Sequence, residues 1–359
     1  MLRVSPVFIA AVLLVWPTSA LRLPKVGRFL RRSDASTQAP IAGAPAVPIA
    51  SDEGAVAEAA TPAGRAKLEQ VRKVLSDETF VTSVASSLPS FGRDRSATAE
   101  EREAIRAARA KLVDDPWVAA RSDAELLPFA RSCSESELAD RLAETSAWRT
   151  RVLPASDDLS WEFGNFFERN ADKFLENPEL GERPFLEWVK ARDEDAEGAP
   201  PLALEGATVL LLRPGRHKVG AIDPDTWLRL IAWHGERATL AWAGEQAAAA
   251  GQPPAAGDDL APPGRGAITI VVDRTGSGLR NQDPALLKEL LPPLTRHFPY
   301  ALHCAYIAPI NVVFWAIWSV VKLVLPSRVT ARFTLLRGDD WRETLAEKLG
   351  PSVAERLPI

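Results

Sequence analysis

The stretch Ile268-Thr-Ile-Val-Val-Asp273 decides the fold class of this chain. Its apolar residues do not alternate with charged ones, which is typical of a strand buried on both faces of a sheet. Upstream, Thr208-Val-Leu-Leu-Leu-Arg213 has the same character and stops at Pro214-Gly215, a pair that ends strands. Residues 301–308 and 333–336 are two further mainly apolar runs, of eight and four residues. We therefore predict four short strands of the kind that parallel sheets contain.

Helical segments separate these strands along the chain. The spacing of apolar residues predicts helices over residues 224–242, 284–297 and 341–349. Asp223 is a suitable cap for the first, with proline in its first turn. Strands that alternate with helices are typical of an α/β domain whose mainly parallel sheet is covered by helices. We expect this domain to occupy residues 206–359.

The residues before this domain predict a small helical subdomain at 64–150. The expected helices cover residues 65–75, 100–113, 123–131 and 134–148. Thr98 is followed by Glu101 three residues later, which is the spacing of a capping box. Residues 151–205 predict a helical insertion that ends in an acidic loop, with one of its helices over residues 184–192.

Composition narrows the functional classes. The 359 residues are 46% hydrophobic and 25% charged, as in ordinary globular proteins. A net charge of −4 excludes a generally basic nucleic-acid-binding protein. Two cysteines cannot make a disulfide framework, although Cys133 and Cys304 could pair in an oxidising compartment. His297, His303 and Cys304 do not have the spacing of a known metal site, so we expect neither a metal nor another cofactor.

The amino terminus has the features of a targeting segment. Arg3 precedes an apolar run over residues 7–16 and the small residues Thr18-Ser19-Ala20, which together predict a signal peptide over residues 1–20. Residues 21–63 combine a basic, transit-like segment with a linker rich in Ala, Pro, Ser and Thr. A bipartite plastid leader, a plain signal with a basic pro-segment and an uncleaved anchor all remain open. We expect a secretory or plastid location, either lumenal or peripheral to a membrane.

Residues 310–325 form the most apolar segment of the mature chain. Only Asn311, Ser319 and Lys322 are polar among them, so an ordinary surface helix does not fit. Counted from Ile307, the run reaches 19 residues, which is close to the length of a membrane span, but a span between two strands of one sheet would divide that sheet. Three alternatives remain: a core helix, a lid over an apolar ligand and a membrane span.

The order of several motifs resembles a known family. A strand that ends at Arg213-Pro214 is followed by Asp223-Pro224, and a strand that ends at Asp273 is followed by Gly276. Further along come, in order, His297-Phe298-Pro299, Ala308-Pro309, the spacing Phe314, Trp318, Val321, Lys322 and Leu325, then Arg332-Phe333 and Trp341. In this order, residues 208–358 resemble the CRAL-TRIO lipid-binding domain, of the type found in the yeast phosphatidylinositol-transfer protein.

The resemblance implies a mainly parallel sheet that forms the floor of an apolar lipid pocket closed by a gate helix. The residues expected to line the pocket are Leu210, Leu212, Ile270, Val272, Ile307, Phe314, Trp315, Trp318, Val321, Phe333 and Leu335. Arg213 and Arg332 are candidates to bind a headgroup phosphate, with surface ion pairs as the alternative role. Phosphoinositide-binding members have Glu and Thr where this chain has Tyr300 and Val329, which leaves the identity of the lipid open.

The sequence gives little support for catalysis. The turn Gly276-Ser277-Gly278 is too short for a nucleophile elbow, and no phosphate-binding glycine-rich loop is present. We therefore expect a protein without enzymatic activity or catalytic residues that binds a hydrophobic lipid, contacts membrane surfaces peripherally and transfers or presents the lipid between membranes. The alternatives are a membrane-recruitment adaptor that uses the domain as a scaffold for a protein partner, and a hydrolase. The oligomeric state stays open.

Overall fold

A computed structural model describes residues 57, 60–75, 77, 97–154, 158–189, 203–204, 207–250, 267–299, 302–311, 314–315, 318 and 330–359. The predicted signal peptide and basic segment lie outside the described residues. So do Tyr300, Val321 and Val329.

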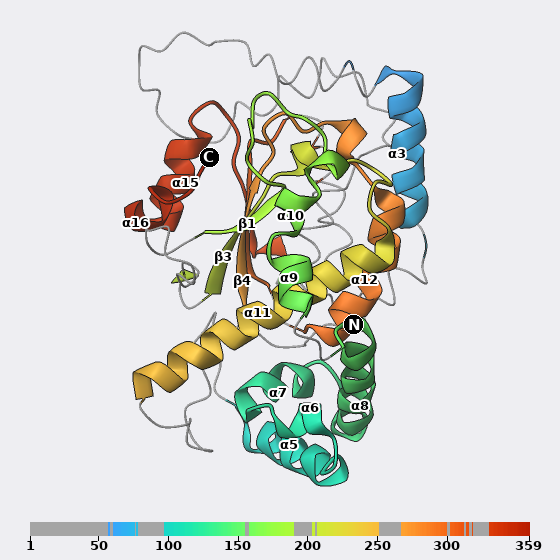
Figure 1. The fold of residues 1–359 in the computed structure, drawn as a ribbon, viewed down its shortest axis with the longest axis vertical. Coiled ribbons are helices and arrows are strands. Elements are labelled where there is room, and N and C mark those ends of the chain that lie inside the picture. The colour runs from blue at the N-terminus through green and yellow to red at the C-terminus, as the bar shows by residue number, and fades with distance from the viewer. Residues whose placement is uncertain are drawn as a thin grey trace, which may run out of the picture.

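One sheet forms the centre of the α/β part (Figure 1). Its strands follow the order β1-β3-β4-β5-β6, and β2 also pairs with β3. The parallel strands are β3 (Ala207–Leu212), β4 (Ile268–Asp273), β5 (Leu302–Ala308) and β6 (Phe333–Leu335). Two short strands, β1 (Leu186–Trp188) and β2 (Ala203–Leu204), run antiparallel to β3. The four predicted strands and the mainly parallel sheet are confirmed.

Helices cover both faces of this sheet. Crossovers between parallel strands are nearly always right-handed, so strands added in one direction place their connecting helices on one face. Accordingly, α11 (Pro224–Ala250) and α12 (Pro284–His297) contribute to a single core with that face. On the opposite face pack α15 (Trp341–Leu349) and α16 (Pro351–Ala354) (Figure 1). Helix α3 (Pro62–Leu75) lies along α12.

The helical subdomain has a core of its own. It contains α5 (Ala99–Lys111), α6 (Pro116–Ala119), α7 (Asp123–Ala130) and α8 (Glu135–Val152). The predicted capping box at the start of α5 is confirmed. Thr98 Oγ1 accepts from the Glu101 backbone N–H at 3.2 Å, and Glu101 Oε2 accepts from the Thr98 N–H at 2.9 Å. Ser122 caps α7 through a second such box with Glu125.

The segment between the two parts differs from its prediction. It contains the short helices α9 (Asp158–Gly164) and α10 (Phe166–Arg169) and the 3₁₀ turn η2 (Ala171–Lys173). The helix predicted over residues 184–192 is wrong, because Leu186–Trp188 form strand β1. Pairing with β3 gives these residues ladder hydrogen bonds along one side of the strand, and this tertiary contact outweighs a weak local preference. Further 3₁₀ turns are η3 (Pro214–Arg216) and η4 (Leu279–Asn281).

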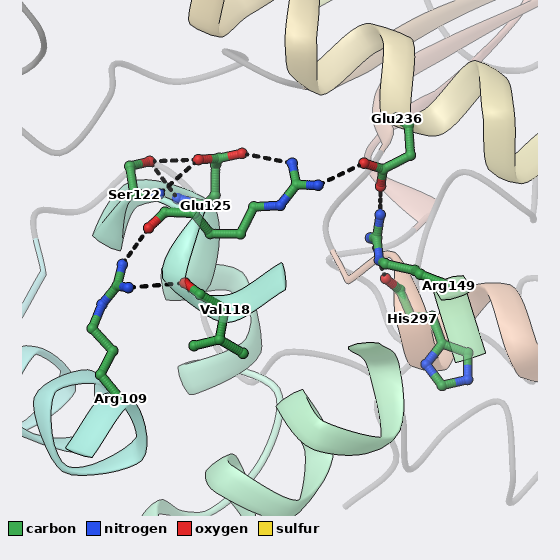
Figure 2. Close-up of polar contacts among 8 residues, drawn as sticks. Arg109, Val118, Ser122, Glu125, Arg149, Glu236 and His297 are labelled. Carbon is green, nitrogen blue, oxygen red and sulfur yellow. Dashed lines mark hydrogen bonds and ion pairs between the residues drawn. The ribbon is translucent and has the colours of Figure 1, made fainter. Parts of the chain in front are cut away.

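A line of charged groups attaches the helical subdomain to the α/β part. Glu236 of α11 pairs with Arg121, 2.9 Å away, and with Arg149 of α8. The Nη2 of Arg149 also donates to the carbonyl oxygen of His297 at 3.0 Å. Figure 2 shows this chain of contacts, which ties α7 and α8 to α11 and to the end of α12. A single carboxylate thus joins Arg149 of α8 to Arg121, which lies in the turn just before α7.

Candidate functional site

One face of the sheet carries most of the predicted lining residues. Side chains alternate between the faces of a strand, so Leu210 and Leu212 of β3 point to the same side. The register pairs Leu210 with Ile270 and Leu212 with Val272 in β4, and Val272 with Ile307 in β5. All five are buried in one apolar core together with α11 and α12. The residues between them, such as Leu211 and Val271, belong to the separate core under α15 and α16.

Strand β6 extends this face at the far edge. Leu335 pairs with Ile307 in the parallel ladder and packs against the same core while remaining half-buried. Phe333 is buried in that core. The structure therefore brings the predicted lining residues of four strands into one continuous apolar surface.

Residues 310–325 contain the spacing that the resemblance assigns to the gate helix, and we call them the gate segment. Some of its residues lie against this surface. Phe314 and Trp318 are helical and are 1% and 2% exposed. The rings of Trp318 and Phe333 are 5.2 Å apart. Trp315, one position from Phe314, is 45% exposed. The other residues of the 312–329 stretch lie outside the described residues, and none of the described helices has both the length and the apolar character that a membrane crossing requires.

A cluster of aromatic rings closes one side of the apolar core, and the sequence did not predict its role. Phe163, Phe167 and Phe174 come from the segment of short helices, and Phe185 comes just before β1. Their neighbours on α11 are Trp227 and Trp233, with Trp227 5.4 Å from Phe185. The aromatic spacing of residues 161–174 was visible in the sequence, but its packing against α11 depends on the tertiary fold.

The two arginines predicted to bind a headgroup lie far apart along the strands. Arg213 follows the carboxyl end of β3, whereas Arg332 precedes the amino end of β6. Because these strands are parallel, the two residues lie at opposite ends of the sheet. A single headgroup can therefore contact at most one of them. The sequence already contained this information. Arg213 follows a predicted strand and Arg332 precedes one, so a parallel sheet places them at opposite ends.

Both arginines have partners inside the protein. Arg213 is fully buried, pairs with Glu187 and donates to the carbonyl oxygens of Pro184 and Pro358 at 2.8 and 3.0 Å. Burial lowers the pKa of Arg213, and the charge of Glu187 partly restores it. The Nη1 of Arg332 donates to the carbonyl oxygens of Leu302 and His303, both at 2.9 Å. These contacts fix the ends of the strands.

Residues with potential metal or redox chemistry are dispersed. Among the described residues, no three histidine, cysteine or acidic side chains come together as a metal site would require. Cys133 and Cys304 are both free thiols. The Sγ of Cys133 lies 3.2 Å from the carbonyl oxygen of Phe129, and the Sγ of Cys304 lies 3.5 Å from Thr269 Oγ1. The pairing that the sequence left open is therefore absent.

Comparison with known proteins identifies the same part of the chain. Residues 204–356 match the family model of the CRAL/TRIO domain. No curated protein matches the chain. The matched range begins at β2 and ends after α16, so it contains the described parallel strands and the helices on both of their faces.

Proposed function

Since residues 204–356 match the family model of the CRAL/TRIO domain, we propose that this protein holds a hydrophobic lipid against the apolar face of its sheet and carries it between membranes. CRAL/TRIO domains bind and transfer lipophilic ligands and are generally not enzymes. The proposal assigns the binding surface to Leu210, Leu212, Ile270, Val272 and Ile307, together with their neighbours on β6.

The continuous apolar face is the observation that carries this proposal. Its residues come from four strands, are in register and face a segment in which Phe314 and Trp318 are helical. A lipid with two long acyl chains has roughly thirty methylenes, whose exposure to water would cost about 25 kcal/mol at ~0.8 kcal/mol each. A carrier has to replace nearly all of that contact with apolar side chains, and this face offers them.

Transfer also requires a surface that meets the bilayer. Trp315 supports such a surface, since its ring is 45% exposed while Phe314 beside it is buried. Tryptophan is favoured at the boundary between water and lipid because its ring is apolar and its N–H is polar. We propose that the gate segment opens when Trp315 enters the headgroup region of a membrane. The energy for opening comes from the better contact that the exposed ring makes with lipid.

The first test is to extract the purified full chain with solvent and identify what it carries by mass spectrometry. The expected result is about one apolar lipid per chain and transfer of that lipid between donor and acceptor vesicles. A protein that takes up no lipid from vesicles and transfers none contradicts the proposal, and a protein partner captured by such a lipid-free chain would favour an adaptor.

Neighbouring residues of β4 point to opposite faces of the sheet, and this supplies a matched pair of variants for the test. Ile270→Phe adds volume on the proposed binding face, whereas Val271→Phe adds volume under α15 and α16. Overpacking costs about 1–3 kcal/mol at either site. Only Ile270→Phe is expected to lower the amount of bound lipid, by several-fold. Equal lipid content in the two variants would show that the lipid does not contact this face.

A further inference from the structure

A buried histidine lies at the edge of the proposed binding face with one ring nitrogen unpaired. His234 is on α11, and its Nδ1 lies 2.9 Å from the Nε1 of Trp188. The indole nitrogen can only donate a hydrogen bond, so Nδ1 has to be the acceptor. A neutral imidazole has one proton, and in His234 that proton is therefore on Nε2.

This Nε2–H is a donor without an acceptor. The atom is buried and has no hydrogen-bond partner among the described residues. The rings of Trp233 and Phe167 lie 4.9 and 6.4 Å from the imidazole. Burial, with a smaller effect from the charge of Arg237, lowers the pKa of His234 to about 3. The ring is therefore neutral at physiological pH, and the Nε2 proton stays in place.

The position of the ring connects it to the apolar face of the sheet. Trp188 of β1 pairs directly with Leu210 of β3, and residues paired in this way point to the same face. Trp227 and Leu230 precede His234 by seven and four positions, so they share its side of the helix. Both are buried in the core that contains Leu210. The unpaired donor is thus next to residues that we assign to lipid binding.

We propose that the Nε2–H of His234 donates a hydrogen bond to an oxygen atom of the bound lipid, so that the protein selects oxygenated neutral lipids, with a carbonyl or hydroxyl inside the site, over hydrocarbons. The inference rests on the proposed function. Buried N–H groups in native proteins are almost always paired. A lipid oxygen satisfies this one, whereas a hydrocarbon leaves it without a partner.

Competition between two matched probes tests the selectivity. The full chain, freed of lipid, is incubated with vesicles that contain equal amounts of methyl palmitate and heptadecane, and the bound probes are quantified after extraction. The expected ratio of ester to hydrocarbon on the protein, normalised to the Trp188→Phe/His234→Phe variant, is about tenfold. The double variant removes donor and acceptor together, which avoids a new unpaired buried group. Trp227→Phe changes another aromatic ring of the same helix, one that packs on Phe185, without removing the donor, and it should keep the preference.

The outcomes separate the inference from the proposed function. Uptake of both probes with the same ratio in the parent chain and the double variant overturns the inference and leaves lipid binding intact. Uptake of neither probe overturns the inference, and it overturns the proposed function as well when the chain also takes up none of the vesicle lipid. A second measurement needs no variant, since the chain has four histidines and ¹⁵N-histidine NMR can resolve them. The Nε2–H resonance of His234 should shift on loading with methyl palmitate and not with heptadecane. An unchanged resonance with bound ester overturns the inference.

Discussion

His297 shows how a single buried residue makes the stability of this protein depend on pH. Its ring stacks on Trp148 with centroids 4.4 Å apart, and its Nδ1 lies 3.0 Å from Thr145 Oγ1. Burial, followed by the positive charges of Arg149 and Arg296, lowers the pKa of His297 to about 3. The folded state therefore keeps this ring neutral, whereas the unfolded chain binds a proton near pH 6.5.

This difference predicts a loss of stability in acid. Between pH 6.5 and about 3 the unfolded state binds more protons, so the free energy of unfolding falls as the pH falls. At pH 5 one such histidine costs about 2 kcal/mol. The substitution His297→Gln keeps a polar group for Thr145 and removes the titration. It should abolish about half of the decrease in urea midpoint between pH 7 and pH 5, with His234 responsible for a similar share. An unchanged decrease in H297Q would contradict this account.

At the scale of elements, the sequence predicted the strands and helix starts that short-range patterns determine. The uninterrupted apolar runs of β3 and β4 identify buried strands wherever they occur, and Thr98 with Glu101 identifies a helix start from four residues alone. Strand β1 escaped prediction because three residues are too few to show a period of two. Its conformation comes from pairing with β3, a contact between segments that no local pattern contains.

The residues of the candidate site also divide into those that the sequence predicts and those that only the tertiary structure reveals. Alternation along a strand was enough to place Leu210, Ile270 and Ile307 on one face once the sheet was known to be parallel. The unpaired nitrogen of His234 was not predictable, because its meaning depends on Trp188 from a strand that the sequence did not reveal. Sequence patterns alone therefore do not identify residues whose role depends on tertiary neighbours.

Substitutions at two glycines can test how tightly the segment before β1 packs against the sheet. Gly276 follows β4 with φ +63°, and a Cβ added there would lie 2.4 Å from Asn177 Nδ2. Gly220 has φ +74° with nothing within 4 Å of such a Cβ. Gly220→Ala should cost about 1–2 kcal/mol from the left-handed backbone alone. Gly276→Ala should cost more, since Asn177, which donates to the Thr275 carbonyl oxygen at 3.2 Å, has to move. Equal unfolding free energies for the two variants would contradict this packing.

At the scale of the whole molecule, the core of the helical subdomain meets the core between the sheet and α11 across a polar junction. The core of the helical subdomain and the core of the α/β part are separate, and Glu236 lies between them as the carboxylate shared by Arg121 and Arg149 (Figure 2). The guanidinium of Arg149 also lies over the rings of Trp117 and Phe298, 4.9 and 4.3 Å from their centroids. Burial, followed by the positive charge of Arg121, lowers the pKa of Arg149 well below its usual value, so an unpaired charge is disfavoured at this place.

The junction predicts that Glu236 couples the two parts far more strongly than an exposed ion pair does. Glu236→Gln leaves two arginines, with side chains 14% and 11% exposed, without their shared counter-charge, and breaking such a buried pair costs about 3–5 kcal/mol. Glu144→Gln is the matched control. Glu144 of α8 pairs with Arg296 of α12 across the same boundary, but these side chains are 45% and 41% exposed, so its loss should cost no more than about 1 kcal/mol. Hydrogen exchange should show faster exchange of α8 amides in E236Q and little change in E144Q. Similar effects in the two variants would mean that apolar contacts, rather than this carboxylate, hold the helical subdomain against the sheet.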